Sequence, residues 1–136
     1  MLDVAHLLPR LARMLLYTYP LPSSTDGPKR DCHWTSLNFL NLETDDRFLD
    51  QAIVKKTIET DYYVVPGEMT FGDVLLFFKP DNTLVHSCVY IADNIVFTKN
   101  GTSFAMPWIL MTLPDVQAFY PSDPPLQMFA FRLKRG

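Results

Sequence analysis

The chain has only two cysteines among its 136 residues, Cys32 and Cys88. Neither belongs to a CxxC pair or to the paired Cys/His spacing of a zinc knuckle. The sequence therefore indicates no disulfide framework, and no metal or organic cofactor is expected.

Long runs of one charge and long apolar runs are also lacking. The net charge is −3, and the 12 basic and 15 acidic residues are mixed along the chain. Binding to a nucleic-acid duplex rests on phosphate neutralisation, so nucleic acid is not an expected partner. Charges and prolines break the apolar stretches well short of the roughly 20 residues that a membrane span needs, so stable membrane insertion is not expected.

The N-terminal stretch does not have the pattern of a signal peptide. "MLDVAHLLPRLARMLLYTYP" carries Asp3 early, has arginines inside its apolar run and lacks a small-residue cleavage site. The length and the hydrophobic content of 48% instead predict one globular domain over 1–136 with a real core. Residues 1–60 are expected to be mainly helical and residues 61–136 mainly β.

Helical signals fill the first part of the chain. Apolar residues at helical spacing predict an amphipathic helix over 2–17, with a kink at Pro9. A short helix is predicted over 32–41. A further helix is expected to begin at a cap formed by Thr44 or Asp45.

After "VVPGEMTFGD" the hydrophobic period changes to that of strands. The segments 73–79, 84–93 and 95–100 are short, β-branched and aromatic, and tight-turn signals separate them, which predicts an antiparallel meander. The segment 107–113 is predicted to be a helical turn or short helix, and 127–134 a last strand. Helices followed by strands indicate an α+β fold with a helical layer against a small curved sheet.

Cys32 stands at the predicted start of a helix, in "KRDCHWTSLNFL". A helix N-terminus presents partial positive charge, which lowers the pKa of a thiol and favours the nucleophilic thiolate. The same turn offers backbone N–H groups to a developing oxyanion. Cys32 is therefore a candidate nucleophile that needs a base.

His86 is the candidate base. Strand alternation separates the residues around it into two faces: His86, Cys88 and Tyr90 on one, and Val85, Ser87, Val89 and Ile91 on the other. The second face is the cleaner core face, so His86 is expected to point toward a helix packed on the sheet. A polar residue of the next strand, Thr98 or Asn100, would orient the imidazole as the third member of a catalytic set.

These blocks together resemble the NlpC/P60 branch of papain-like cysteine hydrolases. The resemblance rests on an Asp-Cys pair that opens a helix, then "GDVLLFF", then "HSCVYIAD", in the family's order and spacing. It implies helices packed on a small antiparallel SH3-like barrel, with Cys32 as nucleophile and His86 as general base. It also implies the third polar position at Thr98 to Asn100 and Tyr19 as an oxyanion-hole residue.

The resemblance further implies a function. Such proteins cleave amide bonds, typically in cell-wall (peptidoglycan) peptides, and are commonly exported or act at the cell envelope. His33 and Trp34 stand where the family keeps small residues, and both are expected on the rim of the cleft, where they would alter specificity.

Two other readings remain open from the sequence. The chain is alternatively an inactive NlpC/P60-like domain used for binding. Less favoured is a structural domain with a zinc site, since the usual ligand spacing is missing; its four candidate ligands are Cys32, His33, His86 and Cys88. The sequence indicates no particular oligomeric state.

Overall fold

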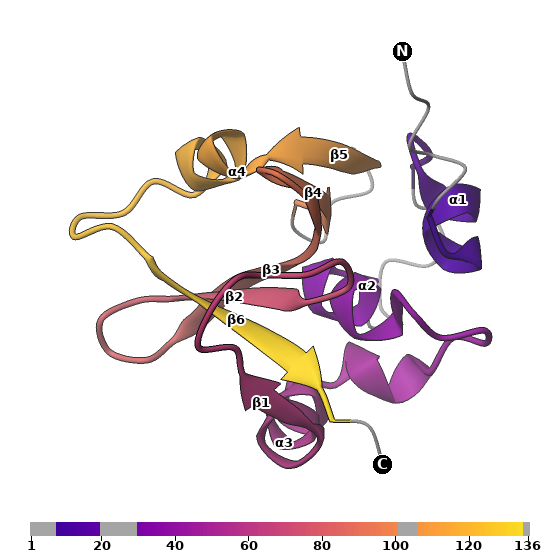
Figure 1. Ribbon diagram of the computed structural model, residues 1–136, viewed down its shortest axis with the longest axis horizontal. Helices are drawn as coiled ribbons and strands as arrows, with labels where there is room; N and C mark the ends of the chain where they lie inside the picture. The colour runs from indigo at the N-terminus through magenta and orange to yellow at the C-terminus, as the bar shows by residue number, and fades with distance from the viewer. Residues whose placement is uncertain (1–7, 20–29, 101–105, 135–136) are drawn as a thin grey trace.

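The computed structural model describes residues 8–19, 30–100 and 106–134, and it is an α+β fold (Figure 1). Its sheet is antiparallel, with six strands in the order β1-β6-β2-β3-β4-β5. The strands are β1 (Tyr62–Val64), β2 (Val74–Phe78), β3 (Leu84–Ala92), β4 (Ile95–Lys99), β5 (Trp108–Thr112) and β6 (Gln127–Leu133).

Short helices cover both faces of this sheet. They are α1 (Arg10–Leu15), α2 (Cys32–Asn38), the 3-10 helix η2 (Asp46–Leu49), α3 (Gln51–Asp61) and α4 (Leu113–Phe119). In Figure 1, α1 and α2 lie on the right of the sheet and α4 lies at its upper left. None of the helices in the described ranges has the length and apolar character needed to cross a membrane.

The buried residues form two clusters, one on each face of the sheet. The larger contains Leu37 of α2 together with Val89 and Ile91 of β3. The smaller contains Cys88 of β3 and Val116 of α4. Alternate residues of β3 thus enter different cores, and His86 shares its face with α4. His86 does point toward a helix, as predicted, but that helix is not the one that carries Cys32.

Several predicted elements are confirmed, including the three strands of the meander and the last strand. The prediction of a helical turn or short helix over 107–113 is wrong: this segment forms β5, which pairs along its length with β4. An apolar run this short does not distinguish helix from strand. The helix that the sequence analysis missed is α4, which begins just after it, where the hydroxyl of Thr112 accepts a bond from the backbone N–H of Asp115.

The N-terminal helices are shorter than predicted. Residues 1–7 lie outside the described part, and α1 begins directly after Pro9, which precedes the helix rather than kinking it. Asp45 is the cap, but it starts the 3-10 helix η2, and a second cap at Asp50 starts α3. Each carboxylate accepts a backbone N–H, so one predicted helix is two.

A buried ion pair ties the start of β2 to β6. The Asp73 side chain is 2% exposed and accepts two hydrogen bonds from Arg132, at 2.8 Å from Nε and 2.9 Å from the terminal nitrogen. It also accepts the backbone N–H of Thr70 at 2.8 Å. Burial works to raise the pKa of Asp73, but the bonds from Arg132 and Thr70 outweigh it, so the pKa lies below its ordinary value.

We expect Arg132→Gln to lower the free energy of unfolding at pH 7, because it leaves a buried carboxylate with a weaker partner. Because the pKa of Asp73 is depressed, its contribution is present above about pH 4 and lost as the pH falls through the folded-state pKa. Urea denaturation at pH 7 and pH 3 measures both effects, and the difference between wild type and variant should shrink at pH 3.

Arg47→Gln is the matched control. Arg47 pairs with Asp45 at 2.7 Å, but its side chain is 73% exposed. Exposed pairs contribute little, so this variant should unfold almost as wild type does. Equal losses in the two variants would contradict a special role for Arg132.

Candidate functional site

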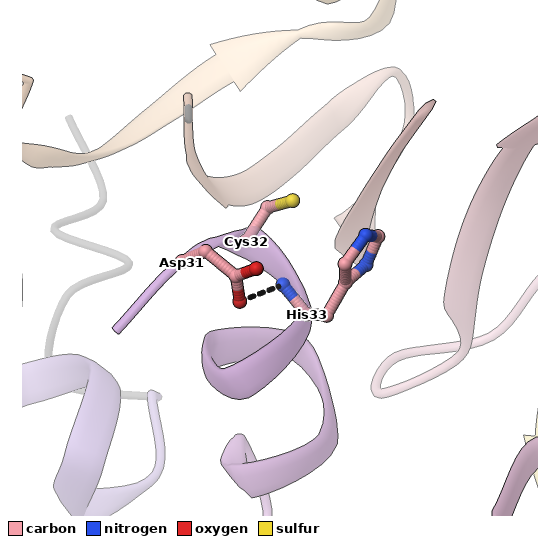
Figure 2. A group of neighbouring side chains, drawn as sticks. All are labelled: Asp31, Cys32 and His33. Atoms are coloured by element: carbon pink, nitrogen blue, oxygen red, sulfur yellow. Dashed lines mark hydrogen bonds between the residues drawn. The ribbon is translucent and has the colours of Figure 1, made fainter. Parts of the chain in front are cut away.

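The first turn of α2 is fixed by its N-cap residue. The Asp31 carboxylate accepts the backbone N–H groups of His33 at 3.0 Å and Trp34 at 2.9 Å. Its carbonyl oxygen accepts the Thr35 hydroxyl at 2.8 Å. Figure 2 shows the bond to His33, with the Cys32 thiol directed out of the turn. The cap stabilises the helix by about 1 kcal/mol and sets Cys32 at its first position.

The Cys32 thiol is buried against strand β3. The residue is 5% exposed, and its sulfur is hydrogen-bonded by the backbone and hydroxyl of Ser87 and by the backbone of His33. Burial raises the pKa of Cys32 to about 12 and the charge of Asp31 adds to the rise, while the hydrogen bonds oppose it. The thiol is therefore protonated at neutral pH.

The expectation that the helix N-terminus lowers the pKa of Cys32 is thus wrong here. The Asp31 carboxylate already takes the N–H groups of His33 and Trp34, and its negative charge lies next to the sulfur. Desolvation destabilises the thiolate more than the first turn of this short helix stabilises it. In this free protein the thiol needs a base to remove its proton.

An ordered chain of side chains holds His86. Its Nε2 lies 2.9 Å from the Thr98 hydroxyl, which donates in turn to Oδ1 of Asn100 at 3.1 Å. Because the Thr98 proton is committed to Asn100, the hydroxyl oxygen accepts from Nε2–H. The tautomer is thereby fixed, and Nδ1 is the unprotonated nitrogen. Thr98 and Asn100, the two alternatives from the sequence, both belong to this chain, with Thr98 next to the ring.

The unprotonated nitrogen of His86 is an unsatisfied acceptor in the interior. His86 is fully buried, and Nδ1 has no hydrogen-bond partner among the described residues. Burial lowers the pKa of His86 to about 3, and the charge of His33 contributes to the decrease. The ring is therefore neutral at neutral pH. A buried acceptor without a donor is rare and calls for an explanation.

The Cys32 thiol lies close to the face of β3 that carries His86, since its charge acts on Cys88 and Tyr120 of that face. Ser87, which binds the sulfur, is the next residue after His86, so the thiol lies one peptide unit from the histidine. The β3–β4 pairing extends only to Val89 opposite Phe97, so residues 86–88 are paired with β2 but not with β4. Within the described ranges, no hydrogen bond joins Cys32 to a ring nitrogen of His86.

Two aromatic rings pack on His86. Tyr120, just after α4, stacks on the imidazole with ring centroids 4.4 Å apart and an interplanar angle of 25°. Phe77 of β2 lies at 5.9 Å. The Tyr120 hydroxyl is buried and has no partner in the described part of the chain, and burial raises its pKa. Tyr120 was not identified from the sequence, because α4 itself was not predicted.

His33 and Trp34 lie in the interior rather than on a cleft rim, with 4% and 0% exposure. His33 Nδ1 lies 2.7 Å from the Ser87 hydroxyl, and the Trp34 indole donates to Asp46 at 3.0 Å. Both therefore serve to dock α2. The rim expectation fails because α2 presses its first turn directly onto β3.

Tyr19 lies at the surface, since it is 60% exposed. Its assignment to an oxyanion hole stays a prediction. The zinc set also does not assemble among the described residues: the donor atoms of Asp31, Cys32 and His33 lie within 4.8 Å of one another, but His86 and Cys88 are not in that group. The Asp31 carboxylate in it is engaged by the helix cap.

Lys99 is a buried charge near the site that the sequence analysis also missed. It is 0% exposed, and its Nζ lies 5.9 Å from the centroid of the Trp108 ring, whose indole donates to Thr35 of α2 at 2.8 Å. Burial lowers the pKa of Lys99, while the charges of Cys32 and Asp31 oppose this. A lysine at a core-facing strand position was the available signal.

Comparisons with protein families, curated proteins and solved structures found no match for this chain.

We expect Asp31→Asn to speed alkylation of Cys32 severalfold at pH 8. Asparagine keeps the cap but removes the negative charge that helps to raise the thiol pKa. Iodoacetamide labelling, followed by peptide mass spectrometry from pH 7 to 10, should show the rate for the variant displaced to lower pH. In wild type the rate should climb across this range without a plateau near neutral pH.

The control is Asp45→Asn, which changes the cap of η2 and should leave Cys32 labelling unchanged. A neutral-pH plateau in wild type would mean that the thiol is already ionised and would contradict the protonated resting state.

Proposed function

We propose that the protein is a cysteine hydrolase of the NlpC/P60 type, with Cys32 as nucleophile and His86 as general base. The observation that carries this proposal is the chain from Asn100 through Thr98 to His86, which leaves the buried Nδ1 unprotonated and without a donor, while Ser87, the next residue of β3, binds the protonated Cys32 thiol. A structural histidine has no need of an acceptor kept empty in this way. A general base requires one.

The resting pair is neutral, so the proton moves during the reaction rather than before it. The thiol rotates from Ser87 toward the imidazole, Nδ1 takes its proton, and the sulfur forms a bond to the carbonyl carbon of the substrate. The imidazolium then gives that proton to the leaving amine as the C–N bond breaks. A thioester on Cys32 remains.

Water completes the cycle. It adds to the thioester carbon as Nδ1 accepts one of its protons, the C–S bond breaks, and the proton returns to the sulfur. Thr98 stabilises the imidazolium throughout by accepting Nε2–H. The hydroxyl and backbone N–H of Ser87, which already contact the sulfur, are donors close to the developing oxyanion.

The substrate that the motif order favours is an amide bond in a cell-wall peptide, and an exported or envelope-associated setting fits it. The support is the sequence resemblance together with an α+β fold in which a Cys-led helix packs on the His-led strand. The fold alone does not select a substrate.

A second candidate is a non-catalytic binding domain of the same kind. The specific observation in its favour is that both reactive groups are buried and neutral, with pKa values near 12 for Cys32 and near 3 for His86. An inactive relative is free to keep such a closed pair. Turnover separates the two candidates.

We expect Thr98→Val to lower kcat/KM about 10- to 100-fold, because the isosteric change removes the acceptor that fixes the imidazole tautomer. His86→Phe should cost about 10²- to 10⁴-fold through loss of the base, and Cys32→Ala should abolish turnover. Soluble cell-wall peptide fragments are incubated with each protein, and new amino and carboxyl termini are quantified by mass spectrometry.

Cys88→Ala is the matched control, since it removes the other buried thiol and should retain turnover within about twofold. If wild type cleaves none of these fragments and no acyl group is found on Cys32, the binding-domain candidate takes precedence.

A further inference from the structure

A cavity of about 300 Å³ lies beside the candidate site, between α4, the loop that follows it and strand β2. Eight residues line it, and none of them carries a charge. Phe77 and Val116 form the buried part of the wall, while Gln117 on the exposed side of α4 lies at its mouth. The cavity is therefore lined mainly by apolar side chains, with polar atoms from Gln117, Tyr120 and Ser122, and it is reachable from solvent.

Two of its walls are also the two rings that pack on His86. Tyr120 stacks on the imidazole at 4.4 Å, and Phe77 lies at 5.9 Å. The Tyr120 ring is thus a wall that the cavity shares with the candidate base. The Tyr120 hydroxyl adds a buried polar atom without a partner among the described residues.

The size of the cavity indicates what fits. A cavity of about 150 Å³ holds one benzene molecule, so about 300 Å³ has room for an acyl chain of up to about eight carbons or an aromatic side chain. A charged group is disfavoured, because the lining offers no counter-charge and desolvating an ion is costly.

We propose that this cavity is the subsite for an uncharged, apolar acyl group of the substrate. The proposal rests on the proposed hydrolase function and deepens it, since it places the carbonyl of that acyl group at Cys32 and its apolar chain against Phe77 and Tyr120. It selects apolar acyl amides and esters over stem-peptide segments whose carboxylates would have to enter the cavity.

The first test is hydrolysis of p-nitrophenyl esters from acetate to octanoate, with the ester of a six-carbon acid that ends in a second carboxylate. Each buried methylene is expected to raise kcat/KM about fourfold until the cavity is full, and the carboxylate-ended ester should react at least tenfold more slowly than the hexanoate. Gln117→Trp, which fills the mouth, should cut the octanoate-to-acetate ratio at least tenfold.

Ala118→Trp is the matched control, because Ala118 is the next residue of α4, is exposed and does not line the cavity. It should keep the chain-length preference. Esters hydrolysed through Cys32 with no preference for longer chains, or with a preference that Gln117→Trp leaves intact, would overturn the subsite while the hydrolase function stands.

The second test needs no turnover. Calorimetric titration of Cys32→Ala protein with octanamide should show binding at least tenfold tighter than with acetamide, and Gln117→Trp in the same background should remove that difference. Octanamide binding in a protein that hydrolyses nothing would support the subsite and refute the hydrolase. No octanamide binding would refute the subsite, whatever the activity.

Discussion

The docking of one helical turn onto one strand organises this molecule. Asp31 accepts two backbone N–H groups of α2, and the buried first turn of that helix contacts Ser87 through the Cys32 sulfur and the His33 ring. Because the contacts are polar and buried, they fix both the position and the rotation of the helix, which apolar packing alone leaves adjustable. Trp108 adds a bond from β5 to the same helix.

The positions of the candidate site residues follow from the alternation of side chains along β3 beneath this contact. Ser87 faces α2, so His86 and Cys88 must face α4. Cys32 of α2 and His86 of β3 are the proposed nucleophile and base, and Ser87, which binds the sulfur, is the residue next to His86. Both groups are buried away from water. Burial raises the pKa of the thiol and lowers that of the imidazole, so both stay neutral at neutral pH. If the proposed function holds, a substrate must disturb this closed state to react.

Much of this was accessible from the sequence, and the failures have physical causes. The meander and the cap at Asp31 were predictable because they rest on local signals, a two-residue period and a side chain that bonds its own helix. The partners of β3 were not, because both of its faces are largely buried and alternation does not say which core each enters. Tyr120 was missed because it follows α4, a helix that begins directly where strand β5 ends. The pKa of Cys32 depends on burial, which the local sequence pattern does not indicate.

The hydrogen bonds that link Asn100, Thr98 and His86 all donate in one sense, and a sulfur atom determines that sense. Nδ2 of Asn100 lies 3.0 Å from Sδ of Met111 in β5, and a thioether only accepts. The amide must therefore turn its nitrogen to Met111 and its oxygen to Thr98. Had the amide faced the other way, it would donate to Thr98, Thr98 would donate to Nε2, and the proton of the imidazole would move to Nδ1. An apolar residue two strands away from His86 thus determines which end of the imidazole is basic.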